Sequence, residues 1–473
     1  MKIVKERNYK RIDAQDLVEF SSICGESYVL TDPEAVDKYG SDETEDLHFP
    51  PEVIIKPATA EEISAILKYC NQHLIPVTPR GGGTGLSGGA LPIFGGVVLS
   101  MERFNQIIKI DELNQQAVVQ PGVITQVLQE ACISQNLYYP PDPSSRGSCF
   151  IGGNLAENAG GPRAVKYGVT KDFILGLEAV LPSGEIIKTG AYTLKNSTGY
   201  NLTQLLTGSE GTLAVITKII LKLVPYPRQS LTMLVPFNSE TRACEAVSAI
   251  FRAGVTPSAL EFMERSAIEW TLHYNPDIQV DLPEDVKAHL LIECDGQDFD
   301  AVMKECETIS TVLEEYGAGE ILFAQTAAEK ESVWKLRRRV AEAVKSNSVY
   351  KEEDTVVPRY RLPELLAGVK EVGNRYGFQS VCYGHAGDGN LHVNIIKGEL
   401  ADDFWKNELP KAIREIFKLC VELGGTLSGE HGIGWVQKEY MDIAFSETEL
   451  NLQKGIKDVF DPNGILNPGK IFI

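Results

Sequence analysis

Residues 79–89 of the chain read Pro-Arg-Gly-Gly-Gly-Thr-Gly-Leu-Ser-Gly-Gly, with six glycines in the last nine positions. The stretch contains the spacing of the dinucleotide-binding fingerprint, Gly83-x-Gly85-x-x-Gly88. That fingerprint requires a helix directly after the glycines, because the pyrophosphate binds at the helix N-terminus. Residues 90–96 (Ala-Leu-Pro-Ile-Phe-Gly-Gly) cannot begin a helix, so we reject a Rossmann unit. Such a loop can still bind phosphates through its backbone N–H groups, and the alternative is a turn between two strands.

Further stretches rich in glycine and proline follow before residue 220. They are Pro140–Pro143, Ile151–Asn154, Asn158–Gly161, Tyr167-Gly168, Asn196–Gly199 and Gly208–Thr212. Clustered glycines mark backbone that turns sharply or approaches a ligand closely. Together with residues 79–89 they make three glycine-rich regions, which predict one extended ligand that crosses several loops.

Helix and strand signals alternate along the chain. Thr59 and Glu62 form a capping box that opens a helix with Ile63, Ile66, Leu67 and Cys70 on one face. Strands are predicted at 96–100, 106–110, 117–120, 288–293 and after Gly389. Helices are predicted near 239–253, 298–316, 327–347 and 362–376, through Ile413–Val421, and from the capping box Ser446–Glu449 to about Phe460. Two prolines at 224–228 indicate a domain boundary.

The chain's length and composition limit its class. At roughly 100–200 residues per domain, 473 residues make two to four domains. A net charge of −20 argues against nucleic acid or an anionic membrane surface as the main partner. We find no secretory signal and no apolar run long enough to span a membrane. The nine scattered cysteines form no CxxC pair, which predicts reduced thiols in a cytoplasmic protein and no iron–sulfur cluster.

Three of the seven histidines occur among glycines. Residues 384–395 read Gly-His-Ala-Gly-Asp-Gly-Asn-Leu-His-Val-Asn-Ile, and residues 428–434 read Ser-Gly-Glu-His-Gly-Ile-Gly. Strand alternation puts His392 and Asn394 on one face, and Leu391, Val393 and Ile395 on the other. Two imidazoles with a carboxylate suit zinc, manganese or iron, whereas a single histidine is more often a hydrogen-bonded core residue. The core or surface interpretation applies to the remaining four, His48, His73, His273 and His289.

A local group of cations stands out in this acidic chain. Residues 333–341 read Val-Trp-Lys-Leu-Arg-Arg-Arg-Val-Ala, and Tyr350-Lys351 follows. Arginine binds carboxylates through its bidentate fork, so the segment is a candidate site for an anionic substrate. The alternative is a solvated helix face.

The first half resembles the FAD-binding domain of the vanillyl-alcohol-oxidase-like flavoproteins, through PRGGGTGLSGG, YPPDPSS, IGGNLAENAGG and TGSEGTLAVIT. The resemblance implies that FAD is bound by Arg80, Gly81, Gly82, Gly83, Thr84, Gly85, Ser87, Gly88, Pro141, Ser144, Gly152, Asn154, Asn158, Gly160, Glu210 and Ile216. No histidine or cysteine in these stretches suggests a covalent flavin bond, so we expect dissociable FAD.

The second half resembles the FAD-dependent D-2-hydroxy-acid dehydrogenases, a group that includes D-lactate dehydrogenases, the catalytic subunit of bacterial glycolate oxidase and D-2-hydroxyglutarate dehydrogenase. The matching motifs are GHAGDGNLHVNI, GEHGIG and the final NPGKI. The resemblance implies a divalent metal, zinc before manganese or iron, bound by His385, His392 and Glu430. It further implies His431 as the catalytic base, Asn394 beside the substrate, and Arg337 and Lys351 as carboxylate binders. Ala341 departs from the threonine of the hydroxyglutarate members.

We therefore expect an α+β flavoenzyme. Residues 1–225 would form a two-subdomain FAD-binding domain, residues 226–425 a substrate domain with an antiparallel sheet and helices on one face, and residues 426–473 a helical segment that returns to the flavin. The expected reaction oxidises a small anionic D-2-hydroxy acid, D-lactate or glycolate before D-2-hydroxyglutarate. Electrons would pass to a quinone or to a protein (an iron–sulfur subunit or an electron-transferring flavoprotein), and not to NAD. A non-catalytic FAD-binding electron-relay subunit and a metal-free alcohol oxidase are the competing functions, and a homodimer stays open.

Overall fold

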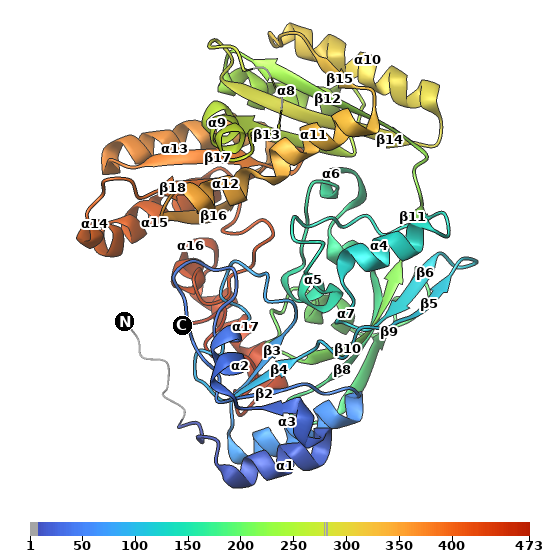
Figure 1. The fold of residues 1–473 in the computed structure, drawn as a ribbon, viewed down its shortest axis with the longest axis vertical. Coiled ribbons are helices and arrows are strands. Elements are labelled where there is room, and N and C mark those ends of the chain that lie inside the picture. The colour runs from blue at the N-terminus through green and yellow to red at the C-terminus, as the bar shows by residue number, and fades with distance from the viewer. Residues whose placement is uncertain (1–7, 279, 281) are drawn as a thin grey trace. The chain divides into compact units, whose positions relative to one another are not determined.

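The computed structural model describes residues 8–278, 280 and 282–473, which divide into two compact units (Figure 1). Unit 1 holds the described residues up to Ala159, together with Val169–Tyr226 and Glu430–Ile473. Unit 2 holds Gly160–Gly168 and Pro227–Gly429. Helices and sheets mix in both units, which is the predicted α+β class.

Unit 1 contains a four-stranded sheet in the order β1 (Val29–Leu30), β2 (Val53–Ile55), β4 (Val97–Ser100) and β3 (Val77–Arg80). The last three are parallel. Helices α1 (Ala14–Cys24) and α3 (Ala60–His73) share a hydrophobic core with this sheet. Helix α3 begins where the capping signal predicts, since the Glu62 N–H donates to Thr59 Oγ1 at 3.1 Å. The glycine loop after β3 leads into strand β4 without a helix, so the rejection of a Rossmann unit is confirmed.

A second, antiparallel sheet of unit 1 runs in the order β5 (Ile107–Asp111), β6 (Gln116–Val119), β10 (Val215–Lys222), β8 (Ile174–Val180) and β9 (Ile186–Gly190). Strand β10 alternates buried and half-buried residues along its length, as a strand with one face in the core does. Strands β7 (Leu137–Tyr138) and β11 (Val224–Pro225) form an antiparallel pair. Strand β11 lies at the prolines predicted to mark a boundary, next to Tyr226, where this part of unit 1 ends. Its other helices are α2 (Pro33–Lys38), α4 (Thr125–Ile133), α5 (Ile151–Glu157) and α7 (Leu202–Leu206).

The C-terminal segment belongs to unit 1. Its helices are α16 (Met441–Ala444) and α17 (Glu447–Phe460), and α17 has the predicted reciprocal capping box of Ser446 and Glu449. After α17 the chain pairs with the edge of β3: the Val77 N–H donates to the Ile465 carbonyl at 2.8 Å, and the Asn467 N–H donates to the Val77 carbonyl at 2.7 Å. These bonds tie the end of the chain to the strand that carries the glycine loop.

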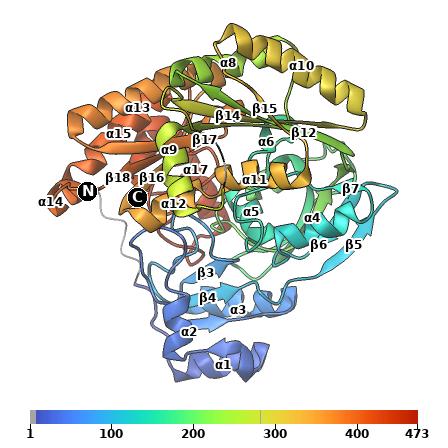
Figure 2. The ribbon, with the colours of Figure 1, turned by 45° about the horizontal axis from the view of Figure 1, so that its top comes forward.

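Unit 2 is built on a seven-stranded antiparallel sheet (Figures 1 and 2). Its order is β15 (Leu322–Ala324), β12 (Gln229–Phe237), β14 (Ala288–Gly296), β13 (Ala259–Glu264), β17 (Gln379–Gly384), β18 (Asn390–Ile396) and β16 (Tyr350–Val356). Cross-strand pairing places His289, Met263, Tyr383, His392 and Asp354 in one row on one face. We call this the histidine face.

Helices cover both faces of this sheet, whereas the sequence predicted helices on one face only. Helices α8 (Glu240–Arg252), α10 (Phe299–Glu315), α13 (Leu362–Tyr376) and α15 (Leu409–Glu422) form one layer, and α14 (Asp402–Asn407) precedes α15. Helices α9 (Arg265–Tyr274), α11 (Ala327–Arg338) and α12 (Val340–Asn347) pack on part of the histidine face and lie together on one side of the strands in Figure 2. The helical stretch predicted near 327–347 is confirmed and consists of two helices, because the backbone leaves helical geometry at Arg339.

A short excursion, Gly160–Gly168 with helix α6 (Ala164–Tyr167), crosses from the first half of the chain to unit 2. Two ion pairs hold it there: Arg163 Nη1 lies 2.6 Å from Glu293 Oε1, and Lys166 Nζ lies 2.6 Å from Asp295 Oδ1. Both acids are on β14. The predicted boundary near residue 225 therefore does not account for this segment, since its partners are more than a hundred residues away in sequence.

All nine cysteines lie in the described part of the chain, where each is a buried, free thiol. In the same residues we find no helix that is both long enough and apolar enough to cross a membrane.

Candidate functional site

The structure brings the predicted glycine loops of unit 1 together. A side-chain carbon on Gly82 would lie 2.5 Å from the Ser148 carbonyl oxygen, so these two backbones are in direct contact. The Asn467 side-chain amide donates to the carbonyls of Gly89 and Glu210, at 2.9 and 2.8 Å. One residue of the C-terminal segment thus joins the first glycine loop to the third.

Loop geometry in residues 81–89 fits a phosphate-bearing ligand. Gly83 and Gly88 have φ values of +69° and +73°, a conformation that side chains rarely adopt. The Ser87 hydroxyl is buried without a hydrogen-bond partner among the described residues, which is unusual unless a ligand supplies one. A carbon added at Gly85 or Gly153 would meet open space. The glycine-rich backbone, the unpaired Ser87 hydroxyl and the open space beside Gly85 and Gly153 therefore occur together at the loops predicted to bind FAD.

Several of the residues predicted to bind FAD also make contacts that hold the loops in place. Arg80 donates from Nη2 to the Ser41 carbonyl at 2.7 Å, and the Asn154 amide donates to Thr125 Oγ1 at 2.6 Å. Asn158 accepts from the Lys171 N–H at 2.9 Å. Gly152 lies against Pro121, Ser144 is exposed, and Ile216 is on β10. Gly160 begins the excursion that belongs to unit 2.

Glu210 anchors the segment that follows Glu430 and His431. Its two carboxylate oxygens accept from the backbone N–H groups of Ile433 at 2.8 Å and Gly434 at 2.6 Å. Burial raises the pKa of Glu210, although these two N–H groups favour its charged form. Gly432 has a φ of +79°, a conformation that side chains rarely adopt, and a carbon added there would lie 2.2 Å from a Glu157 carboxylate oxygen and 3.1 Å from one of Glu210.

Replacement of Gly82 by alanine is expected to lower FAD affinity about 10–100-fold, because the new methyl group pushes the loop off Ser148 at a cost of about 1–3 kcal/mol. The measurement is the FAD content of the purified variant and its Kd on reconstitution. Gly455→Ala is the matched control, since its added carbon meets nothing within 4 Å on helix α17. An unchanged Kd for Gly82→Ala would contradict the role of this loop.

In unit 2, His385 and His392 come together at the end of the β17–β18 hairpin. Their ring centroids are 5.4 Å apart and the ring planes meet at 81°. Both side chains are more than nine-tenths buried. The His385 Nδ1 atom lies 2.8–2.9 Å from the two carboxylate oxygens of Glu261 on β13. This contact fixes the ring and directs Nε2 toward any metal, as a carboxylate does behind many metal-bound histidines.

Glu261 itself is a buried carboxylate between His385 and Arg337. Burial alone would raise its pKa, but His385 and Arg337 outweigh that effect and hold the pKa of Glu261 below its usual range. Arg337 Nη2 lies 2.8 Å from Glu261 Oε2. Glu261 is therefore charged at neutral pH and orients both of its neighbours.

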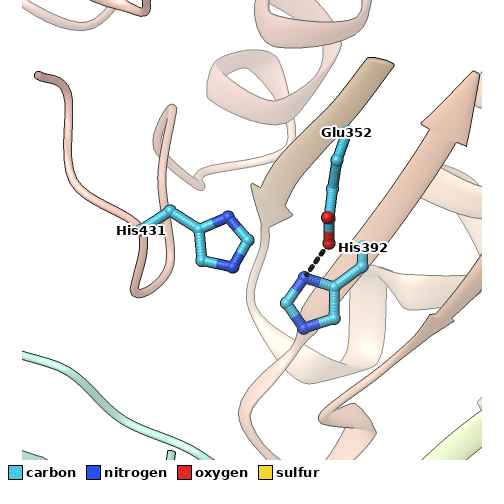
Figure 3. Close-up of side chains that lie close together, drawn as sticks. All are labelled: Glu352, His392 and His431. Carbon is cyan, nitrogen blue, oxygen red and sulfur yellow. Dashed lines mark ion pairs between the residues drawn. The ribbon is translucent and has the colours of Figure 1, made fainter. Parts of the chain in front are cut away.

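His392 has two acids beside it on the neighbouring strand β16. Its Nδ1 atom lies 3.4 Å from Glu352 Oε1, drawn as an ion pair in Figure 3, and 3.8 Å from Asp354 Oδ1. Asp354 also accepts from the Asn390 amide at 2.7 Å and from the Ser428 hydroxyl at 2.8 Å. The region around His392 is consequently acidic. The Asp354 carboxylate also holds the neighbouring loops, through its hydrogen bonds with Asn390 and Ser428.

The predicted ligand Glu430 and the predicted base His431, the latter labelled in Figure 3, follow directly on the last residue of unit 2. That residue, Gly429, donates its N–H to the Asp354 carbonyl at 3.2 Å, and a side chain at 429 would strike Asn390. Gly429 is therefore held beside strand β16, and Glu430 is the next residue along the chain.

The predicted substrate residues divide between the two faces of the sheet. Asn394 lies on the histidine face, opposite Glu352 on β16, and the predicted alternation along β18 is confirmed. Lys351 pairs with Ile395, so its side chain belongs to the opposite face. Arg337 is buried at the end of α11 beside Glu261. The structure thus groups Arg337 and Asn394 with the histidines and separates Lys351 from them.

Three residues of this region carried no signal in the sequence: Glu261, Glu352 and Tyr383. Each has an ordinary local context in its strand, and Glu261 is 124 residues from His385. Strand alternation alone does not place Tyr383 on the histidine face, because that also requires knowing how β17 pairs with β18.

Comparison with known proteins agrees with the geometry of both units. Residues 51–190 match the family model for the FAD binding domain, and residues 226–471 match that of the FAD linked oxidases, C-terminal domain. The chain is 40% identical to glycolate oxidase subunit GlcD of Bacillus subtilis (strain 168), over 92% of each chain. It is 38% identical to a D-lactate dehydrogenase of Anaerostipes hadrus, over 89% of each.

The fold also agrees with a solved structure. p-Cresol methylhydroxylase with substrate bound superposes with a TM-score of 0.78 at 19% identity, covering 97% of this chain and 96% of that one. At this identity the likeness concerns the fold alone. Together with the family matches it leads to one conclusion: the chain belongs to the FAD-linked oxidase family and is an FAD-dependent oxidoreductase.

Proposed function

We propose that this protein oxidises a small D-2-hydroxy acid, D-lactate or glycolate, to the 2-oxo acid, using non-covalent FAD and one divalent metal. The single observation that carries the proposal is the buried pair His385 and His392 with the Glu261 carboxylate behind His385. An FAD-binding scaffold alone has no use for such a pair. The names of the relatives, a glycolate oxidase subunit and a D-lactate dehydrogenase, support the substrate class.

His385, His392 and Glu430 would hold the metal. Two imidazoles and one carboxylate suit zinc, and also manganese or iron. Glu261 supports this assignment, because it makes Nε2 of His385 the atom that faces a metal. When bound, the metal would act as a Lewis acid and lower the pKa of the substrate's 2-hydroxyl.

His431 would accept the hydroxyl proton as the general base. When bound, FAD would supply the redox chemistry by taking up the hydride from C2. Asn394 and Arg337 would orient the acid, the former by its amide and the latter by its guanidinium, whose position Glu261 fixes. Burial of these groups excludes water from the reacting atoms.

Small acids rank first because of the charges near His392. Glu352 and Asp354 present two carboxylates there, which would repel a second carboxylate on the substrate. Ala341 provides no hydroxyl, and Lys351 belongs to the other face of the sheet, so two of the groups expected to grip a diacid are missing. D-2-hydroxyglutarate remains the alternative substrate.

Electrons would leave to a partner protein or a quinone and not to NAD. The chain has no Rossmann unit in its described residues, and one relative is named as a subunit of an oxidase, which supports a protein acceptor such as an iron–sulfur subunit or an electron-transferring flavoprotein. The alternative from another class is a non-catalytic FAD-binding subunit that only relays electrons. The histidine pair argues against that alternative, since electron relay requires neither a metal nor a base.

A substrate panel tests the ranking. We expect kcat/KM with a dye acceptor to be highest for D-lactate or glycolate and at least about tenfold lower for D-2-hydroxyglutarate, the effect of one unfavourable charge contact of about 1.4 kcal/mol. The L-isomers serve as stereochemical controls. A diacid that outperforms both small acids would contradict the ranking and favour the hydroxyglutarate alternative.

A further inference from the structure

Tyr383 is a buried polar residue on the histidine face that has no assigned role. It is 2% exposed, and its hydroxyl makes no well-directed hydrogen bond in the described part of the structure, although the Asn394 side chain is near enough to interact with it. Leaving a buried hydroxyl unpaired is unfavourable, so buried tyrosines nearly always find a partner. Tyr383 lies directly opposite His392 in the β17–β18 ladder, with ring centroids 5.3 Å apart.

Two neighbours of Tyr383 are unsatisfied in the same way. Within the described residues, both amide atoms of Asn394 are buried without a well-directed hydrogen bond, and so is Nε of Arg337. Nη2 of Arg337 is held by Glu261, whose Oε2 lies 2.8 Å away. The Arg337 guanidinium carbon lies 5.0 Å from the centre of the Tyr383 ring. These three side chains come from β17, β18 and α11, and all belong to unit 2.

The unsatisfied atoms are mainly donors. A phenol hydroxyl, an amide NH₂ and Nε of the guanidinium can donate, whereas the Asn394 carbonyl oxygen is the one obligatory acceptor among them. Donors gathered beside a guanidinium fit a planar anion with several acceptor oxygens, which would share Arg337 with Glu261. A carboxylate has this chemistry, and it is present in every 2-hydroxy acid and 2-oxo acid.

We propose that the Tyr383 hydroxyl donates a hydrogen bond to the substrate carboxylate and, with Arg337 and Asn394, forms the carboxylate-binding site. The inference rests on the proposed function, which supplies the substrate class. It extends that function by making Tyr383 a substrate-binding residue. It also assigns Arg337 to the carboxylate that all these substrates share, rather than to a second one at the far end.

The test compares Tyr383→Phe with the wild type as FAD-loaded, metal-reconstituted protein. We expect Kd for pyruvate, measured by calorimetry, and KM for D-lactate to rise about 10–100-fold, since a hydrogen bond to a charged group is lost, while kcat changes less than KM. The unfolding midpoint without ligand should stay equal or rise, because a buried unpaired hydroxyl has been removed. A purely structural role would lower that midpoint instead.

Tyr376→Phe is the matched control. The Tyr376 hydroxyl donates to Glu415 at 2.7 Å in the helix layer on the opposite face, so its loss should leave pyruvate binding unchanged. Equal pyruvate affinity of Tyr383→Phe and wild type would overturn the inference, even if D-lactate still reduces the flavin. If no hydroxy acid reduces the flavin but pyruvate binds and Tyr383→Phe weakens it, the carboxylate site stands and the proposed reaction fails. Failure of the wild type to bind pyruvate or D-lactate would overturn both.

Discussion

Replacement of His392 by alanine is expected to lower turnover with D-lactate by more than about 100-fold, while the FAD content stays normal. Replacing a residue that hydrogen-bonds to a metal ligand typically lowers metal affinity or activity about 10–100-fold, and here a ligand itself is removed. The glycine loop of residues 81–89 is in unit 1 and His392 is in unit 2, so flavin binding should be independent of this change. Steady-state kinetics, flavin absorbance and elemental analysis of the bound metal measure the three quantities.

His289→Ala is the matched control for this prediction. His289 is buried on the same face and in the same row of the sheet, three strands from His392, or roughly 14 Å at the usual strand spacing. Burial lowers the pKa of His289 to about 4, so it is neutral at working pH. It is also not one of the residues proposed to hold the metal, which are His385, His392 and Glu430. The control should keep its metal and its turnover, and a metal-free wild type with full activity would refute the metal assignment altogether.

Replacement of His431 by asparagine is expected to slow reduction of the bound flavin by about 10²–10⁴-fold at saturating D-lactate, which is the usual contribution of a positioned general base. KM should change less, because Arg337, Asn394 and the metal would still hold the acid. Asparagine keeps a polar side chain of similar size, and the Glu210 contacts to Ile433 and Gly434 should preserve the loop. Rapid-mixing absorbance under anaerobic conditions separates flavin reduction from acceptor turnover.

His273→Asn makes the same substitution at an exposed histidine on helix α9 and should leave the reduction rate unchanged. If His431→Asn reduces its flavin as fast as the wild type, another group accepts the hydroxyl proton. Glu352, which lies beside His392, would then be the next residue to replace.

Local signals predicted the elements whose determinants are close together in the sequence. Helix α3 follows from Thr59 and a 3.6-residue apolar period, and α17 follows from its capping box. The helical stretch predicted near 327–347 is present, but its division into α11 and α12 at Arg339 could not be foreseen, because no glycine or proline marks the break. The second helix layer of unit 2 was missed because periodicity shows which helix face is apolar and not which sheet face it covers.

The site shows the same division between local and distant information. Alternation along β18 placed His392 and Asn394 together, because both lie in a single strand. Glu261 escaped detection because only the pairing of β13 with β17 brings it to His385. Lys351 was chosen by its motif, and the β16–β18 register then put it on the face opposite Asn394. A shift of one residue in a strand reverses the face, so motif resemblance alone could not decide this position.

Anaerobic mixing of the FAD- and metal-loaded protein with D-lactate tests whether the protein is a metal-dependent D-2-hydroxy-acid dehydrogenase. We expect D-lactate to bleach the oxidised-flavin absorbance fully and stoichiometrically with pyruvate formed. L-Lactate should not bleach it, and prior removal of the metal by a chelator should slow the D-lactate reaction strongly. Absorbance that stays unchanged with D-lactate, glycolate and D-2-hydroxyglutarate would contradict the account and favour an electron-relay subunit.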